Sequence, residues 1–244
     1  MPTYLKEDTL KPIFASLLAL SLCLNATAQS NFYKMTIGAG AGITQSFADL
    51  AKHDYGIAGY GTFDYLFTPF LSLGFEGQMG EINGGDVNTD PNYRQFINRY
   101  KAFALNGKVY LGALINYERS GFANAIKGLY AGAGAGIVMN TMHFVVREKP
   151  YDASGYVFPG KDNSKDLMIP LNLGINFNFM DRYGYYKYGV NFNYQTNVTL
   201  GEGLDGYDDS PLKFKSGKPD IYTYFSIGLK YHFGSVGLST KTLY

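Results

Sequence analysis

The sequence has few charged residues and almost no charge imbalance. Charged side chains make up 17% of the 244 residues, and 21 basic residues against 20 acidic ones leave a formal net charge of +1. A chain without a basic field has no electrostatic reason to bind nucleic acid, and nothing here indicates an acidic disordered tail. We therefore expect no nucleic-acid partner, and the net charge alone does not identify any other partner.

The sequence also lacks an apolar run long enough for a transmembrane helix. The longest, residues 13–24, is well short of the roughly 20 apolar residues that a membrane-spanning helix needs. Backbone polar groups inside a bilayer must all be paired, and only helices and closed β-barrels achieve this. If this chain spans a membrane, it does so as a barrel.

Cysteine is nearly absent, and its one occurrence lies in a segment that resembles an export signal. Cys23 falls inside the apolar run, and the small residues Ala26 and Ala28 follow it in the pattern that signal peptidase accepts. We expect residues 1–28 to be a cleaved signal peptide and the mature chain to begin at Gln29. That chain then has no thiol, disulfide or cysteine-based metal site.

Tryptophan is absent, whereas glycine (30), tyrosine (22) and phenylalanine (18) are abundant, a mixture that favours strands and turns. Apolar and polar residues alternate with a period of two throughout the mature chain, as in half-buried strands. In the sixth segment, for example, Leu171 and Leu173 alternate with Asn172 and Gly174. The alternating segments cover residues 33–44, 55–66, 71–79, 102–112, 128–137, 169–179, 186–195 and 224–233.

The apolar faces of these segments indicate a barrel that faces lipid. A soluble barrel would turn them inward, but the interior of about eight narrow strands cannot hold so many Phe, Tyr, Leu and Ile side chains. Turned outward, they need no cavity, and segments of about ten residues suit tilted strands that cross the hydrocarbon layer. The sequence predicts an all-β fold, a transmembrane antiparallel up-and-down β-barrel of about eight strands over residues 29–233.

The connections between segments alternate in length. Short periplasmic turns and longer external loops are typical of outer-membrane barrels, so both termini are expected in the periplasm, with 234–244 as a short tail. The connection at 113–127 is longer than this pattern predicts, and a hairpin hidden in the third or fourth loop would raise the strand count to ten. The long connections are 45–54, 80–99, 141–166 and 199–220; the short ones are 67–70 and 180–184.

The last segment carries a motif. Ser226, Gly228, Tyr231 and Phe233 fit the polar, glycine, aromatic and aromatic places of the terminal signal that the barrel-assembly machinery recognises. With the leader and the alternation, the mature chain resembles the small OmpA-type outer-membrane barrels, including the glycine-rich members. The resemblance implies outer-membrane lipid and the assembly machinery as partners. It implies an architecture rather than an activity, and no cofactor.

Two glycine-rich tracts, 38–43 and 132–137, superficially resemble phosphate-binding loops. Such a loop must lead from a strand into a helix whose N-terminus points at the phosphate, and neither tract does so. Lumen-facing glycines that make room for large neighbours are the better interpretation. The tyrosines expected beside them are Tyr60, Tyr110, Tyr130 and Tyr224.

Two enzyme classes use barrels of this size, lipid A acyltransferases and deacylases, and both need a histidine with a nearby serine. His53 lies in the first loop near Ser46 and Asp54 in sequence. His143 is expected in the third loop without a neighbouring serine, and His232 faces the lumen. We expect hydrogen-bonded histidines rather than catalysis.

Asp86, Asn88 and Asp90 have the alternate spacing of a calcium loop. Pro91 stands where such a loop requires glycine, and Ile97 stands where it requires a bidentate glutamate. We expect no metal site here.

The leading interpretation is a non-enzymatic integral outer-membrane protein with a structural or surface-interaction role, and its loops are open to an extracellular ligand. The alternatives are a narrow pore or small-ligand carrier, and a lipid A-modifying hydrolase or acyltransferase. Small residues on the lipid face predict shallow depressions on two opposite strands, one of them a groove for a lipid chain or a neighbouring protein. The alternative is that alanine simply accompanies the lumen glycines in a thin-walled, tightly curved strand. The small residues are Ala39 and Ala41 in the first segment and Ala131, Ala133 and Ala135 in the fifth.

Overall fold

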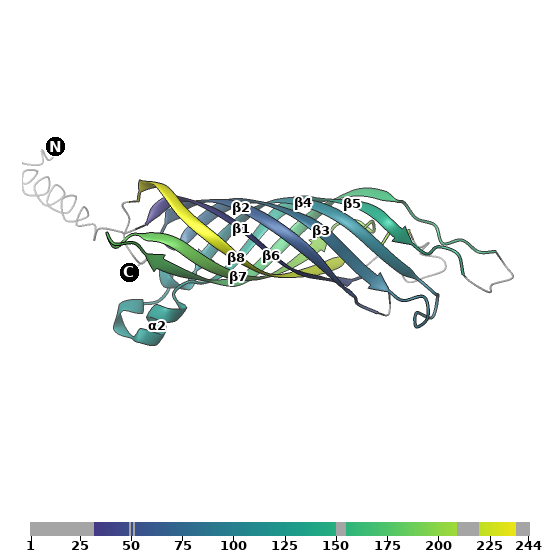
Figure 1. The fold of residues 1–244 in the computed structure, drawn as a ribbon, viewed down its shortest axis with the longest axis horizontal. Coiled ribbons are helices and arrows are strands. Elements are labelled where there is room, and N and C mark those ends of the chain that lie inside the picture. The colour runs from purple at the N-terminus through teal and green to yellow at the C-terminus, as the bar shows by residue number, and fades with distance from the viewer. Residues whose placement is uncertain (1–31, 49, 51, 150–154, 209–219, 238–244) are drawn as a thin grey trace, which may run out of the picture.

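The computed structural model describes residues 32–48, 50, 52–149, 155–208 and 220–237, which form a closed antiparallel β-barrel (Figure 1). Each strand pairs with its neighbours in sequence, and β8 pairs with β1 to close the ring. The strands are β1 (Tyr33–Phe47), β2 (Tyr55–Thr68), β3 (Leu71–Gly85), β4 (Gln95–Tyr110), β5 (Leu129–Val145), β6 (Asn163–Met180), β7 (Tyr186–Thr199) and β8 (Ile221–Val236).

The number of strands is eight, as the alternating segments predict. The described parts of the third and fourth loops add no strand to the ring, and the third loop contributes only an isolated bridge between Glu148 and Val157. The closed order places β1 and β5 on opposite sides of the barrel.

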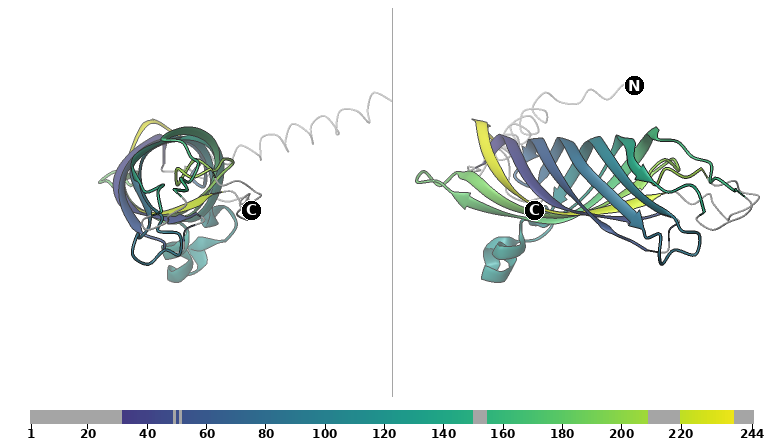
Figure 2. Two further views of the ribbon diagram at one scale, coloured as in Figure 1. Left: turned by 90° about the vertical axis from the view of Figure 1, so that its right-hand side faces the viewer. Right: turned by 45° about the vertical axis from the view of Figure 1, so that its right-hand side comes forward.

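The barrel has two unlike ends. Short connections and both ends of the described chain, Phe32 and Gly237, lie at one end, which we call the turn end. The longer connections extend from the other end, which we call the loop end (Figures 1 and 2).

The long connection between β4 and β5 lies at the turn end. It folds into two 3-10 turns, η1 (Leu111–Ala113) and η2 (Tyr117–Arg119), followed by the helix α2 (Gly121–Ile126). The hydroxyl of Ser120 caps α2 by accepting from the Ala123 amide at 3.3 Å. This explains why the segment breaks the expected pattern of short turns. Among the described residues, no helix is long and apolar enough to cross a membrane.

Alternation places the apolar side chains outside and the polar ones in the lumen. In β6, Leu171 and Leu173 are exposed, whereas Asn172 and Asn176 are buried. The same separation holds around the ring, because successive side chains of a strand point to opposite faces.

Several strands are longer than their alternating segments. β4 begins at Gln95 and β6 at Asn163, so polar positions assigned by sequence to loops 80–99 and 141–166 are paired strand. Backbone pairing does not require apolar side chains, so strands continue past the end of the apolar band. Sequence alternation marks the band, not the strand ends.

The last strand also extends beyond the expected barrel boundary at Phe233. Val236 pairs with Tyr33, and the Gly237 amide donates to the Phe32 carbonyl at 2.9 Å. Gly234 has a φ of +91°, which interrupts the side-chain alternation that marked the end in the sequence. The predicted cleavage residues Ala26, Ala28 and Gln29, and residues 238–244, lie outside the described part of the chain.

Candidate functional site

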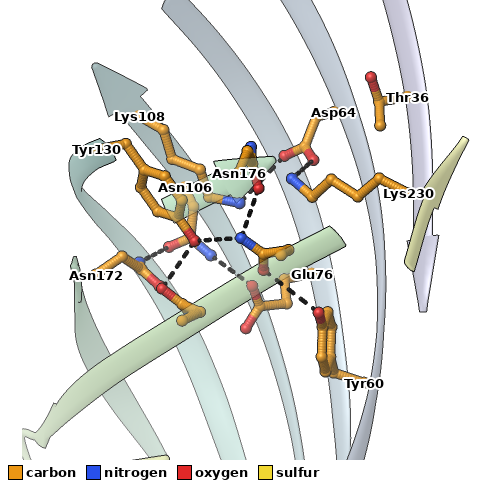
Figure 3. A network of polar contacts seen from close by, with 12 residues as sticks. Thr36, Tyr60, Asp64, Glu76, Asn106, Lys108, Tyr130, Asn172, Asn176 and Lys230 are labelled. Atoms are coloured by element: carbon orange, nitrogen blue, oxygen red, sulfur yellow. Dashed lines mark hydrogen bonds and ion pairs between the residues drawn. The ribbon is translucent and has the colours of Figure 1, made fainter. Parts of the chain in front are cut away.

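The lumen of the barrel holds an extended polar network, and an ion cluster lies within it toward the turn end (Figure 3). The Asp64 carboxylate pairs through Oδ1 with Lys108 Nζ at 3.3 Å and through Oδ2 with Lys230 Nζ at 3.1 Å. The three side chains come from β2, β4 and β8 and are at most 5% exposed. One carboxylate therefore neutralises two lysines only in part.

Glu76 supplies the second negative charge of this layer. Its Oε1 accepts from Gln78 Nε2 at 2.6 Å and from Gln195 Nε2 at 3.1 Å, and its Oε2 accepts from Asn106 Nδ2 at 3.4 Å. Gln78 also donates to the Gln195 side-chain carbonyl. Two buried carboxylates and two buried lysines thus balance in the part of the lumen nearer the turn end.

Asparagines and a tyrosine continue the network across β5, β6 and β7. The Tyr130 hydroxyl donates to Asn193 Oδ1 at 3.0 Å and accepts from Asn191 Nδ2 at 2.9 Å. Asn193 in turn donates to Asn172 Oδ1 at 3.0 Å. Contacts across the ring join this network to the other wall, because Gln195 of β7 donates to Glu76 of β3 and the Tyr60 hydroxyl of β2 donates to Asn191 Oδ1 of β7 at 3.4 Å (Figure 3). The network therefore crosses the lumen.

Three lumen glycines make room for Tyr60 or Tyr130, as the sequence predicts, but only one of them, Gly40, belongs to a glycine tract. A Cβ atom at Gly40 would lie 2.7 Å from the Tyr60 ring, and one at Gly228 would collide with the Tyr60 hydroxyl. A Cβ at Gly174 would meet the Tyr130 hydroxyl at 2.5 Å. In the second tract, a Cβ at Gly132 or Gly134 would instead meet backbone oxygens and the side chain of Lys108 or Asn106. The glycine tracts are therefore packing features of the wall, with no phosphate-binding geometry.

The loop end of the lumen is closed by side chains from two loops. Phe158, Leu204 and Tyr207 are buried among strand residues that include Phe96 and Tyr222. The view along the barrel axis shows chain segments inside the ring (Figure 2). These loops thus form a cap seated in the barrel mouth.

Polar contacts hold this cap in place. The Leu204 carbonyl accepts from Asn98 Nδ2 at 2.8 Å, and the Tyr207 hydroxyl donates to the Val146 carbonyl at 2.6 Å. The buried guanidinium of Arg94 lies 5.8 Å from the Phe158 ring centroid and 5.5 Å from that of Tyr207, within cation-π range. Arginine from the second loop therefore joins the third and fourth loops.

The turn end holds a vestibule of about 670 Å³ below an aromatic cluster. Phe70, Tyr110 and Tyr117 are buried there, and the Lys127 ammonium lies 5.0 Å from the Tyr117 ring. Burial raises the pKa of Tyr117 to about 12, so its hydroxyl remains protonated at neutral pH. This cluster joins the β2–β3 turn, the end of β4 and the long turn, and it lines the vestibule.

Among the described residues, no hydrogen bond joins His53 to Ser46 or Asp54, its neighbours in sequence. The Ser46 hydroxyl is buried and donates to the Asn83 carbonyl at 2.7 Å, whereas His53 packs its ring 4.8 Å from that of Phe47. Asp54 accepts from the backbone amide of the next residue. Each of these three side chains thus has a structural contact of its own.

The other two histidines lie on strands. His232 faces the lumen, with Nδ1 at 2.7 Å from Thr36 Oγ1 and Nε2 at 3.3 Å from Asn178 Oδ1. His143 lies within β5, not in the third loop where the sequence analysis placed it, because β5 extends to Val145.

The carboxylates with calcium-like spacing in the second loop make hydrogen bonds and an ion pair with nearby loop residues. Asp86 Oδ1 accepts from the Asn88 amide at 2.9 Å, and Oδ2 pairs with Lys52 at 3.0 Å. These contacts lower the pKa of Asp86, the backbone hydrogen bond first. Asp90 Oδ1 accepts from the Asn92 amide at 2.8 Å. Within the described residues, no three metal-ligating side chains gather.

The four residues of the terminal motif divide between the two faces of β8. Ser226 and Gly228 are buried in the lumen wall, whereas Tyr231 is exposed on the outside. Phe233 lies on the same outward side, with its ring stacked 6.1 Å from that of Tyr231. The aromatic positions are therefore accessible from the membrane.

The predicted lipid-face alanines all point outward, but the hollow near them lies to one side. Ala39 and Ala41 pair with Gly61 and Gly59 of β2, which are also small. A hollow of about 270 Å³ is lined by Gly61 and Gly77, so it lies over β2, β3 and β4 and not over β1. The two glycines could have been read from the sequence, because they share the period of Phe63 and Phe75. Ala131, Ala133 and Ala135 are exposed on β5.

Sequence reasoning missed two groups of residues. The first group is the cap, Phe158, Leu204 and Tyr207, which the sequence marks only as apolar residues within otherwise polar loops. The second group is the outward basic side chains of β4 and β6. On β4 the sequence could have indicated them, because Lys101 and Arg99 continue the period-two face of Phe103. A second groove, of about 580 Å³, is lined by Arg99, Tyr100, Lys101, Met139, Asn140, Thr141, Asn163, Ser164 and Lys165.

Several solved structures match this chain at low sequence identity. The Neisserial surface protein NspA is 10% identical, with 82% of this chain and 97% of that chain covered and a TM-score of 0.47. Ail of Yersinia pestis is 11% identical, with 83% and 99% covered and a TM-score of 0.42. OprG from Pseudomonas aeruginosa is 10% identical, with 84% and 99% covered and a TM-score of 0.36. No curated protein matched.

Family membership is shown by a sequence-family match. The family described as the outer membrane protein beta-barrel domain matches residues 14–233, which is most of the chain. The closed eight-strand ring with an apolar exterior agrees with that match. The chain belongs to the outer membrane protein β-barrel domain family and is an integral outer-membrane protein.

Proposed function

We propose that this protein is a non-enzymatic, non-conducting outer-membrane barrel with a structural or surface-interaction role. The observation that carries the proposal is the filled lumen. Four buried charges balance within one layer, with amide and tyrosine side chains joined across them. An ion or solute would have to break this network to pass, at a high cost for uncompensated buried charge.

The loop end is proposed to face the cell exterior, with both termini in the periplasm. Long loops at one end and short turns at the other are the usual asymmetry of such barrels. The loop end also carries the folded cap of Phe158, Leu204 and Tyr207, which offers an ordered surface for contact with other molecules. We therefore propose that the protein acts through contacts of its loops and not through transport across its interior.

Conductance in planar bilayers tests the closed lumen. We expect no discrete channel steps from the refolded protein, whereas a porin in the same bilayer serves as the conducting control. Reproducible steps of one size would instead favour the narrow-pore alternative. Mass spectrometry of lipid A from cells with and without the gene tests the enzyme alternative, and we expect identical lipid A.

Thiol labelling in intact cells tests the orientation. Glu202→Cys places a thiol in an exposed part of the fourth loop, and Tyr183→Cys places one at the turn end, where the native side chain is 86% exposed. A membrane-impermeant maleimide should label only the Glu202→Cys variant until the outer membrane is permeabilised. Labelling of Tyr183→Cys alone would reverse the proposed orientation.

A further inference from the structure

Three basic side chains gather on the outer wall near the loop end. Lys101 of β4 and Lys165 of β6 flank Met139 of β5 in one cross-strand row. In the next row toward the loops, Arg99 and Asn163 flank Thr141. Residues of both rows line the groove of about 580 Å³. The groove therefore combines cations with amide and hydroxyl groups.

The groove lies at the edge of the apolar band. Toward the turn end, the next outward residue on β4 is Phe103 and the next on β6 is Leu167, and both are exposed. Further outward positions on β6, including Leu171 and Leu173, are also exposed and apolar. Because the apolar band covers the hydrocarbon layer, the basic rows stand at the level of lipid headgroups.

The cations of the groove exceed its anions. Arg99 pairs with Glu81 at 3.1 Å, and both side chains are about half exposed. Lys101 and Lys165 have no carboxylate partner among the residues that the structure describes. Two free ammonium groups beside an apolar surface favour an anion that belongs to the membrane.

The apolar hollow adjoins this groove, and Lys101 lines both. Gly61 and Gly77 lie at the hollow of about 270 Å³, among the rings of Phe63, Phe75 and Phe103. The Phe75 and Phe103 rings are stacked, with centroids 6.0 Å apart. The apolar lining of the hollow suits an acyl chain, with the cation Lys101 at its headgroup side.

We propose that this composite surface binds one phosphorylated glycolipid of the outer leaflet. The phosphate contacts Lys101 and Lys165, sugar hydroxyls contact Thr141 and Asn163, and one acyl chain lies in the hollow beside Gly61. The assignment of the leaflet rests on the proposed function, because it requires the loop end to face outward. The polar donors beside the lysines favour a glycolipid over a simple phospholipid.

Titration with lipid A, read by native mass spectrometry of the refolded protein in detergent, tests the phosphate contacts. The double variant Lys101→Gln, Lys165→Gln should bind bis-phosphorylated lipid A about thirtyfold more weakly, from the usual contribution of a basic residue near anionic lipid. The matched control, Arg182→Gln with Lys187→Gln, removes two positive charges at the turn end and should bind as the wild type does.

The substitution Gly61→Leu tests the hollow. A Cβ at Gly61 would meet only the Gly38 carbonyl oxygen, at 3.9 Å, so the wall accommodates the first atom of a side chain that extends into the hollow. We expect lipid A binding to weaken about tenfold as chain contacts are lost. The control is Gly107→Leu, since a Cβ at Gly107 is equally open, with the Ala133 carbonyl oxygen at 3.8 Å, and lies outside the hollow.

Three outcomes would overturn the proposal. Equal binding of dephosphorylated lipid A would show that the phosphate contributes no contact. Equal binding of phosphatidylglycerol would show that the lysines extend to any anionic headgroup and do not select a glycolipid. Displacement of lipid A by equimolar inorganic pyrophosphate would indicate a site for free anions. These binding measurements in detergent do not depend on the orientation of the protein in the membrane. A reversed thiol-labelling result would therefore contradict the proposed orientation and leaflet but would leave the binding results unchanged.

Discussion

At the scale of single residues, the lumen depends most on Asp64, because both buried lysines pair with it. Lys108 lies on one side and Lys230 on the other, and all three side chains are excluded from solvent. A buried ion pair adds little over an apolar replacement, but removal of one partner leaves an uncompensated charge. Position 64 is therefore where one substitution disturbs the most.

Asp64→Asn should destabilise the barrel by about 3–5 kcal/mol, because it leaves two buried lysines without their carboxylate. Reversible urea unfolding in lipid vesicles measures the loss. The double variant that adds Lys230→Met should recover most of it, since the remaining Lys108 then balances the buried carboxylate of Glu76. A double variant less stable than Asp64→Asn would contradict this account.

At the scale of elements, the end of β8 is part of the barrel wall and carries aromatic rings that contact two other strands. Phe233 packs near Phe63 of β2, with ring centroids 6.5 Å apart, and near Tyr231, which contacts Tyr188 of β7. The motif residues thus lie at a junction of three strands. Aromatic residues at such a position belong to the girdle at the membrane interface.

Phe233→Asp should lower the amount of folded, heat-modifiable protein in the outer membrane, because it places a charge in that girdle and disrupts the proposed assembly signal. Ser235→Asp is the matched control, since it adds the same charge at an exposed position two residues away. Normal folded levels of the Phe233→Asp variant would remove the proposed role of this residue.

The same strand predicts where truncation begins to matter. Loss of residues 238–244 should leave heat-modifiability unchanged, whereas a chain that ends at Gly234 loses the pairing of Val236 with Tyr33 and the Gly237 contact with Phe32. The shorter chain should therefore unfold at a lower temperature on semi-native gels. Equal behaviour of both truncations would mean that these terminal contacts add nothing.

At the scale of the whole molecule, the direction in which the apolar side chains point decides whether the outside of the barrel contacts lipid or water. Leu173 is 57% exposed on β6, whereas Asn176 on the same strand is 6% exposed and donates to the Tyr110 hydroxyl at 3.0 Å. In a bilayer the first contacts lipid and the second contacts the lumen network. Substitutions at the two positions therefore test the whole architecture.

Leu173→Arg should cost about 2–4 kcal/mol of folding free energy in vesicles, the usual range for a charge near the bilayer midplane. Asn176→Ser should cost less, because it keeps a hydroxyl within the polar lumen. Both are measured by reversible folding into the same lipid. The opposite ranking would mean that the polar face, not the apolar one, meets the surroundings.

The sequence by itself determined a barrel of about eight strands, the outward apolar face and the lumen glycines, and the structure decided between eight strands and ten. Period two is a local property, so a strand such as residues 169–179 shows its two faces without knowledge of its neighbours. The terminal motif around Gly228 was legible for the same reason. The strand ends were not, because pairing at Gln95 or Val236 depends on the partner strand and not on alternation.

Only the tertiary structure decided which lumen residues meet, what closes the loop end and where cations gather on the wall. Asp64 and Lys230 are separated by 166 positions in the sequence, and Asn98 and Leu204 by 106. Lys101 and Lys165 become neighbours only because β5 lies between them in register. Such contacts depend on ring closure and register, which set the distances between strands that no local pattern records.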